Sequence, residues 1–197
     1  KLFKPLNILL AEPEKQADSS DASDSDSTKD TNGDSSSSKD GERSPNNDSL
    51  SQRDKMKIGH WGEEYSIKCI RKELLEQYQN SKSLETEKGF NILVEGKVVA
   101  SIFWLNKNKD IGEGYDIEVK EENTQTFIEV KATKTNSKDI VQISGKQWRT
   151  AQVKQDNYYI YRVYNAGKKQ ARLEKICNPS KLFQTGYITA HTLTLKI

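Results

Sequence analysis

The sequence predicts an α/β (α+β) domain, in which helices flank a mixed central sheet, preceded by a disordered tail. Two observations lead to this prediction. The order of elements read along the chain is helix, several strands, helix, strands, which is typical of a mixed sheet with flanking helices. Hydrophobic residues make up only 33% of the 197 residues, too few for a fully packed chain. We therefore expect disorder over residues 1–53 and one folded domain over residues 54–197.

The first segment has the composition of an acidic linker. Residues Glu12–Arg53 are mainly Ser, Asp, Asn, Lys and Gly, and such a segment buries too little apolar surface to offset its ordering entropy. Residues 1–50 hold 6 of the 31 basic and 11 of the 29 acidic side chains, so residues 51–197 hold 25 and 18. A net charge of −5 thus precedes a net charge of +7, which favours an anionic partner for the domain.

Apolar periodicity defines the elements of the domain. Ile58–Tyr78 is predicted as a helix because Trp61, Tyr65, Ile70, Leu74 and Tyr78 form one apolar stripe. A second helix opens at Ser144, which has Gln147 at the capping-box spacing. A hairpin turn is expected at Glu95-Gly96. Strands are predicted at Asn91–Val94, Lys97–Leu105, Tyr115–Val119, Thr126–Ala132, Tyr158–Tyr164, Ala171–Ile176 and Ile188–Ile197.

Three charged residues on two neighbouring strands form the candidate site. Glu129 and Lys131 point to the same face of their strand, because side chains alternate. Asp116 is similarly isolated between apolar residues on the preceding strand, so pairing of the two strands would bring all three together. Two carboxylates can hold Mg²⁺ or Mn²⁺, which activates water, and the lysine can orient that water. The alternative interpretation is that Glu129 and Lys131 form an ion pair on an exposed strand face, which would contribute little to stability.

Basic side chains cluster in the loops around these residues and along the second helix. These side chains could neutralise backbone phosphates and so bind nucleic acid in a salt-dependent manner without sequence preference. A solvated basic face is an equally good interpretation. A zinc site is not expected, because His60 and His191 are single and far apart and the sequence has no Cys/His cluster at ligand spacing. The cluster comprises Lys107, Lys109, Lys131, Lys134, Lys138, Lys146 and Arg149, with Gln147 beside it.

Six short segments occurring in order resemble a known family. Together they resemble the NO VEIN C-terminal domain, and Asp116 followed by Glu129-x-Lys131 resembles the core motif of the PD-(D/E)xK nuclease superfamily. The likeness covers about residues 55–195. The segments are Gly59–Glu64, Phe103–Asn106, Gly114–Ile117, Ile128–Thr133, Ile143–Ala151 and Tyr158–Val163.

The resemblance implies a restriction-endonuclease-like αβββαβ core. It places the metal ligands on Asp116 and Glu129, the catalytic lysine on Lys131 and a helical acid on Glu63, with Glu64 as the less favoured substitute. Tyr115 departs from the superfamily pattern, which has proline before the aspartate. The nucleic-acid-binding residues that we predict are Lys134, Lys146, Gln147 and Arg149.

Three functions follow from these expectations. The first is a Mg²⁺- or Mn²⁺-dependent nuclease, with DNA favoured over RNA. The second is an inactive module of a nuclear regulatory protein that binds nucleic acid or protein, and the third is a purely structural interaction domain. The first residue is Lys1, so we expect a fragment whose partner includes an N-terminal domain of the same longer protein. Two distant cysteines predict an intracellular protein, and the lack of a long apolar stretch predicts no membrane partner. A nuclear location, if the protein is eukaryotic, is what the family resemblance implies.

Overall fold

The computed structural model describes residues 50–108, 111–137 and 140–189. The predicted tail therefore lies almost wholly outside the described residues. In chain order the elements are α1 (Gln52–Gln77), β1 (Lys82–Thr86), β2 (Gly89–Val94), β3 (Lys97–Trp104), β4 (Ile117–Glu121), β5 (Gln125–Ala132), α2 (Gly145–Lys154), a 3₁₀ turn (Gln155–Asn157), β6 (Tyr158–Tyr164), β7 (Arg172–Cys177) and α3 (Pro179–Gln184).

The seven described strands form one sheet in chain order, β1 to β7. Neighbouring strands are antiparallel except β5 and β6, which are parallel and joined through α2. The predicted mixed sheet with flanking helices is thus confirmed. The αβββαβ order that the resemblance implies is found in α1, β3 to β5, α2 and β6, but with β1 and β2 inserted between α1 and β3. Glu95 and Gly96 join β2 to β3 with φ of 52° and 78°, as a two-residue hairpin turn with left-handed residues requires.

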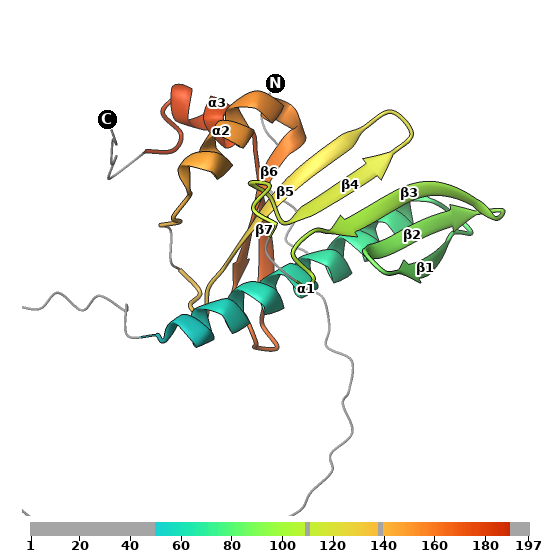
Figure 1. The fold of residues 1–197 in the computed structure, drawn as a ribbon, viewed down its shortest axis with the longest axis horizontal. Helices are drawn as coiled ribbons and strands as arrows, with labels where there is room; N and C mark the ends of the chain where they lie inside the picture. Colours follow the sequence, from blue (N-terminus) through green and yellow to red (C-terminus); the bar gives the residue numbers. More distant parts are fainter. Residues whose placement is uncertain (1–49, 109–110, 138–139, 190–197) are drawn as a thin grey trace, which may run out of the picture.

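Helices cover both faces of the sheet (Figure 1). The long α1 packs on one face over the main core, which includes Ile128 and Val130 of β5. The second helix packs on the other face, where Phe127 of β5 joins Ala151 and Tyr158 in a smaller core. Both faces of β5 are therefore buried, and a charged side chain on this strand needs specific partners. No helix among the described residues is long and apolar enough to cross a membrane.

A glycine allows α1 to approach β5 closely. A Cβ placed on Gly62 would lie 2.5 Å from the Cβ of Ala132, so any larger residue must displace the helix or the strand. Gly59, one turn earlier, has no atom within 4 Å of such a Cβ. The close contact at Gly62 brings the next residue of α1, Glu63, towards the β5 strand that carries Glu129 and Lys131.

Several boundaries differ from the sequence prediction. α1 begins at Gln52 rather than Ile58, because the Ser51 side chain caps it by accepting from the Asp54 N–H at 3.1 Å. Asp116 precedes β4 by one residue instead of lying within a strand. The strand β1 and the helix α3 were not predicted. The predicted strand Ile188–Ile197 is wrong at Ile188, which lies in a bend, and residues 190–197 lie outside the described part of the chain.

Candidate active site

Glu129 is the buried centre of the site. Its side chain lies on the α2 face of β5 and the residue is only 3% exposed. Oε1 lies 2.8 Å from the Lys131 ammonium and accepts a hydrogen bond from Gln147 Nε2 at 2.5 Å. Oε2 is buried, and no described residue donates a hydrogen bond to it. Glu129 and Lys131 point to the same face and pair as predicted, and the alternative of an exposed ion pair does not hold, because Glu129 is buried and Lys131 is only partly exposed.

Gln147 connects this pair to the start of α2. Its Oε1 accepts from Lys131 Nζ at 3.2 Å and from the Ser144 backbone N–H at 2.9 Å. Ser144 Oγ accepts in turn from the Gln147 N–H at 3.2 Å, which completes the predicted capping box. The helix cap and the charged pair therefore share one amide side chain.

Asp116 is held at the end of β4 by both of its carboxylate oxygens. Oδ1 accepts from Asn106 Nδ2 at 2.7 Å, and Oδ2 accepts from the Val130 N–H at 2.7 Å. Its backbone bridges the neighbouring strands, because its N–H donates to Ile128 O and its carbonyl accepts from the Leu105 N–H, each at 2.9 Å. These four bonds fix the carboxylate beside the residue pair Glu129 and Lys131.

Burial, followed by the neighbouring charge of Asp116, raises the pKa of Glu129 to about 7. The Lys131 ammonium opposes both effects without cancelling them. A carboxyl group with this pKa is partly protonated near neutral pH and becomes fully ionised once a cation compensates its charge. A cation bound beside Glu129 would therefore compete with the proton on its carboxyl group.

Glu63 contributes from α1, but at the edge of the site. Its Oε2 accepts from the Trp104 indole N–H at 2.6 Å, and its charge is among the effects that raise the pKa of Glu129. The Trp104 ring also packs against His60 at 4.8 Å between ring centroids, with the two rings tilted by 51°. Glu64 is paired instead with Lys68 at 2.9 Å along the exposed side of α1. The structure thus favours Glu63 over Glu64 as the helical acid near the site.

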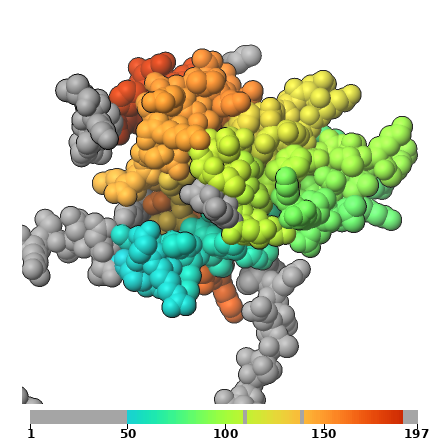
Figure 2. Space-filling model, viewed as in Figure 1, coloured from blue at the N-terminus to red at the C-terminus, as the bar shows by residue number. Residues whose placement is uncertain are grey.

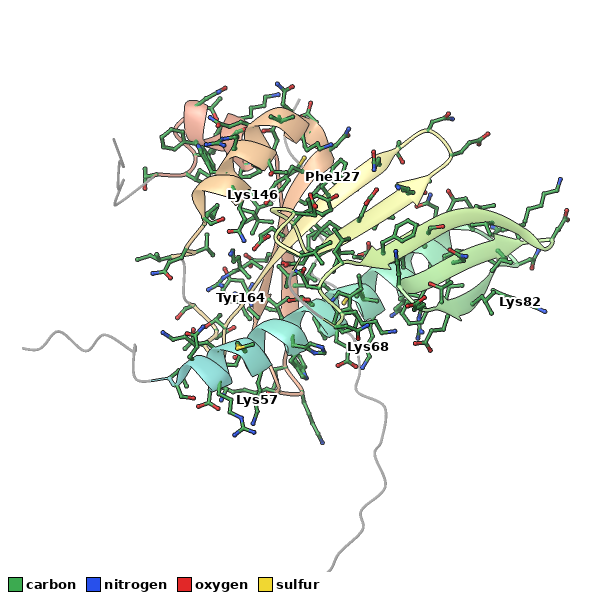
Figure 3. The ribbon with its side chains drawn as sticks, viewed as in Figure 1. Lys57, Lys68, Lys82, Phe127, Lys146 and Tyr164 are labelled. Atoms are coloured by element: carbon green, nitrogen blue, oxygen red, sulfur yellow. The ribbon has the colours of Figure 1, made fainter. Side chains whose placement is uncertain are left out.

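A pocket of about 270 Å³ opens directly onto the two acids. Asp116 and Glu129 line it together with Lys146 and Gln147, two of the residues predicted to bind nucleic acid. The segment between β3 and β4 lies at the surface beside α2 (Figure 2). Lys146 of α2 and Phe127 of β5 lie at the same end of the molecule (Figure 3).

The other predicted basic residues are not gathered at this pocket. Lys134 and Arg149 are exposed on the surface, outside the described lining. Lys107 pairs with Glu85 at 3.5 Å. Lys109 and Lys138 lie outside the described residues. A basic cluster around the site is therefore supported mainly by Lys131 and Lys146.

The residues present fit a hard divalent cation with few protein ligands. Within the described part of the chain, no group of three or more His, Cys, Asp or Glu side chains is arranged to hold a metal. What the site does offer is a pair of carboxylates and, at Glu129 Oε2, a buried oxygen that no described donor satisfies. Magnesium commonly binds through one or two carboxylates and keeps several waters, so this donor set suits it better than zinc.

Three residues of the site were not recognised from the sequence. Asn106 binds Asp116, Trp104 binds Glu63, and Tyr115 lines the pocket. Trp104 packs against the core, and its indole N–H donates to Glu63. A polar residue close to the end of a strand, as Asn106 is two residues after β3, was an available signal.

Known proteins resemble the part of the chain that contains this site. A family model described as "Protein NO VEIN, C-terminal" matches residues 62–176, which include all four predicted catalytic residues. Protein NO VEIN of Arabidopsis thaliana is 31% identical over 90 residues, covering 45% of this chain and 3% of the relative. Protein NO VEIN-LIKE of the same plant is 32% identical over 90 residues, covering 45% of this chain and 14% of the relative.

The chain thus spans only a small part of the length of these two relatives. No solved structure matches it significantly. The family match extends over more than half of the chain, from Gly62 on α1 to Ile176 on β7. By this criterion the chain belongs to the family described as Protein NO VEIN, C-terminal.

Proposed function

We propose that this domain hydrolyses phosphodiester bonds of nucleic acids with Mg²⁺ or Mn²⁺, as a member of the PD-(D/E)xK superfamily. The observation that carries the proposal is that buried Glu129 pairs with Lys131 and lines an open pocket together with Asp116. A purely structural role gives no reason to bury a carboxylate whose second oxygen has no described partner.

Each residue has a distinct role in this reaction. Asp116 and Glu129 would hold the metal ion, which supplies an activated water and neutralises charge on the phosphate. Lys131 lies 2.8 Å from Glu129, so its ammonium can also orient the attacking water and stabilise the charge that develops on phosphorus. Water forms the new P–O bond, the bond to the leaving oxygen breaks, and that oxygen takes a proton. Glu63, held by Trp104, supports the ligands from α1.

The test is cleavage of a substrate panel by purified protein with Mg²⁺ or Mn²⁺. We expect Lys131→Met to lower the cleavage rate about 10²- to 10³-fold, as loss of one transition-state donor does in other enzymes. Lys120→Met on the neighbouring strand β4 is the matched control, because Lys120 is half exposed and pairs only with Glu118 among the described ion pairs. Equal cutting by wild type and Lys131→Met would point to a contaminating nuclease and defeat the proposal.

A second candidate is an inactive module that binds nucleic acid or protein. It is favoured by one observation, that no described group of three acids is arranged to hold a metal. Calorimetry separates the two functions. No uptake of Mg²⁺ or Mn²⁺ by the wild type, combined with salt-sensitive binding of DNA, would select the inactive module. Metal uptake that is lost in Asp116→Asn would select the nuclease.

A further inference from the structure

The pocket above the acids has two walls that are fixed to each other. One wall is the segment before β4 with Gly114 and Tyr115, and the other is the start of α2 with Ser144 and Lys146. Gly114 has a φ of +87°, and a Cβ there would lie 2.6 Å from Thr150 Oγ1 on α2. The wall thus depends on glycine both for its backbone conformation and for its close contact with the helix.

The Tyr158 hydroxyl also fixes the segment before β4 that contains Gly114 and Tyr115. Tyr158 on β6 is 1% exposed, and its hydroxyl donates to the Gly114 carbonyl at 3.0 Å. Contact with α2 on one side and this bond on the other define the position of the next residue, Tyr115. The pocket is therefore already formed before any ligand enters, which reduces the entropic cost of binding.

Tyr115 gives this pocket an aromatic wall. Its side chain is partly exposed, and its ring packs edge-on with the Phe127 ring at 4.9 Å between centroids and 73° between planes. Phe127 is buried, and the Lys154 ammonium lies 4.0 Å from its ring centroid. The support from Phe127 holds the tyrosine ring next to Asp116, the neighbouring residue and proposed metal ligand.

An aromatic residue and a cation that line the same pocket suit one class of ligand. Lys146 is exposed, and it lines the pocket together with Tyr115. Bases stack on aromatic side chains regardless of sequence, and lysine neutralises backbone phosphate. In a duplex both faces of a base are already stacked, so only an unpaired nucleotide presents a free face without a cost for unstacking.

We propose that the substrate of this site is single-stranded nucleic acid, bound with an unstacked base on the Tyr115 ring and its phosphate towards Lys146 and the acids. This inference deepens the proposed function and rests on it for the reaction. It also predicts binding that can be measured without cleavage. The stacking contribution of one base to an aromatic side chain corresponds to about 5- to 150-fold in affinity.

The binding test compares a labelled oligothymidine strand with a blunt duplex by fluorescence anisotropy, using the full chain and Ca²⁺ in place of Mg²⁺. We expect the strand to bind more tightly than the duplex. Tyr115→Leu keeps an apolar contact with Phe127 but removes the ring, so it should weaken strand binding about 5- to 150-fold and leave duplex binding unchanged. Tyr115→Phe should bind as the wild type does.

Tyr187→Leu is the matched control, because this tyrosine is 78% exposed and lies after α3, outside the described pocket lining. A thermal unfolding midpoint of Tyr115→Leu equal to that of the wild type would show that any loss of binding is not caused by unfolding. The inference is overturned if Tyr115→Leu binds the strand as tightly as the wild type, or if the duplex binds as tightly as the strand.

Cleavage with Mg²⁺ separates this inference from the proposed function. A strand that binds through Tyr115 but is never cut would refute hydrolysis and retain the single-strand site. A duplex that is cut in preference to the strand, equally by wild type and Tyr115→Leu, would retain hydrolysis and refute the single-strand site.

Discussion

Replacing Glu129 with glutamine should make the metal-free domain more stable above neutral pH. The pKa of Glu129 in the folded protein is about 7, against an ordinary value of 4.5. The difference of about 2.5 pKa units corresponds to about 3 kcal/mol, the cost of ionising this carboxyl in its buried position. That value already includes the favourable pairing with Lys131. Glutamine removes the cost and keeps an oxygen for Lys131.

The pH dependence has a definite sign. Because the folded state holds the Glu129 proton more tightly than the unfolded state, this group lowers the free energy of unfolding as pH rises from about 4.5 to about 7. Below that window the wild type and Glu129→Gln should be equally stable. Above it the variant should be more stable by up to about 3 kcal/mol.

Urea denaturation of both proteins across this range, without metal, measures the difference. Glu64→Gln on α1 is the matched control, because Glu64 is 46% exposed and outside the site. Saturating Mg²⁺ near pH 8 should then stabilise the wild type, by about 2.7 kcal/mol at a hundred times Kd, and have little effect on the variant. A stability difference that is the same at every pH would refute the proposed burial cost, whatever its size.

Two further substitutions test the positions of the helices around the site. Gly62→Ala should destabilise the domain by about 1–3 kcal/mol, because its Cβ would lie 2.5 Å from that of Ala132. Gly59→Ala has open space around the new methyl group, so it should be neutral or slightly stabilising in the same urea denaturation experiment. Ser144→Ala should lower the free energy of unfolding by about 1 kcal/mol through loss of the α2 cap, and threonine at this position should retain most of the stability. Equal stability of the wild type, Ser144→Ala and Ser144→Thr would show that the cap contributes nothing.

The sequence predicted most elements because their patterns are local. The predicted strand Tyr158–Tyr164 has the bounds of β6, since a buried interior strand is a continuous apolar and aromatic run. The capping box at Ser144 was equally readable. By contrast, β1 was missed because most of its residues are exposed, so it carries no apolar alternation, and it is held by pairing with β2. The short α3 was missed because its 6 residues are too few to show a helical apolar periodicity.

The site was predicted in its residues but not in its connections. Alternation along β5 placed Glu129 and Lys131 on one face, and the adjoining strand brought Asp116 close. The partners Asn106, Trp104 and Tyr115 come from segments whose approach depends on the tertiary fold. No local pattern distinguishes a tryptophan that only packs from one that also donates to a carboxylate.

The hydrogen bonds around Glu129 bear on how the proposed cation would bind. Oε1 is occupied by Lys131 and Gln147, and Gln147 is in turn fixed by the α2 cap. Oε2 is the oxygen for which no described donor exists. A cation that approached through the pocket could therefore bind Oε2 without breaking the bonds of Oε1, so the lysine would stay in place as the proton leaves. Loss of the Ser144 cap should then weaken cation binding, because it loosens the amide that holds Oε1.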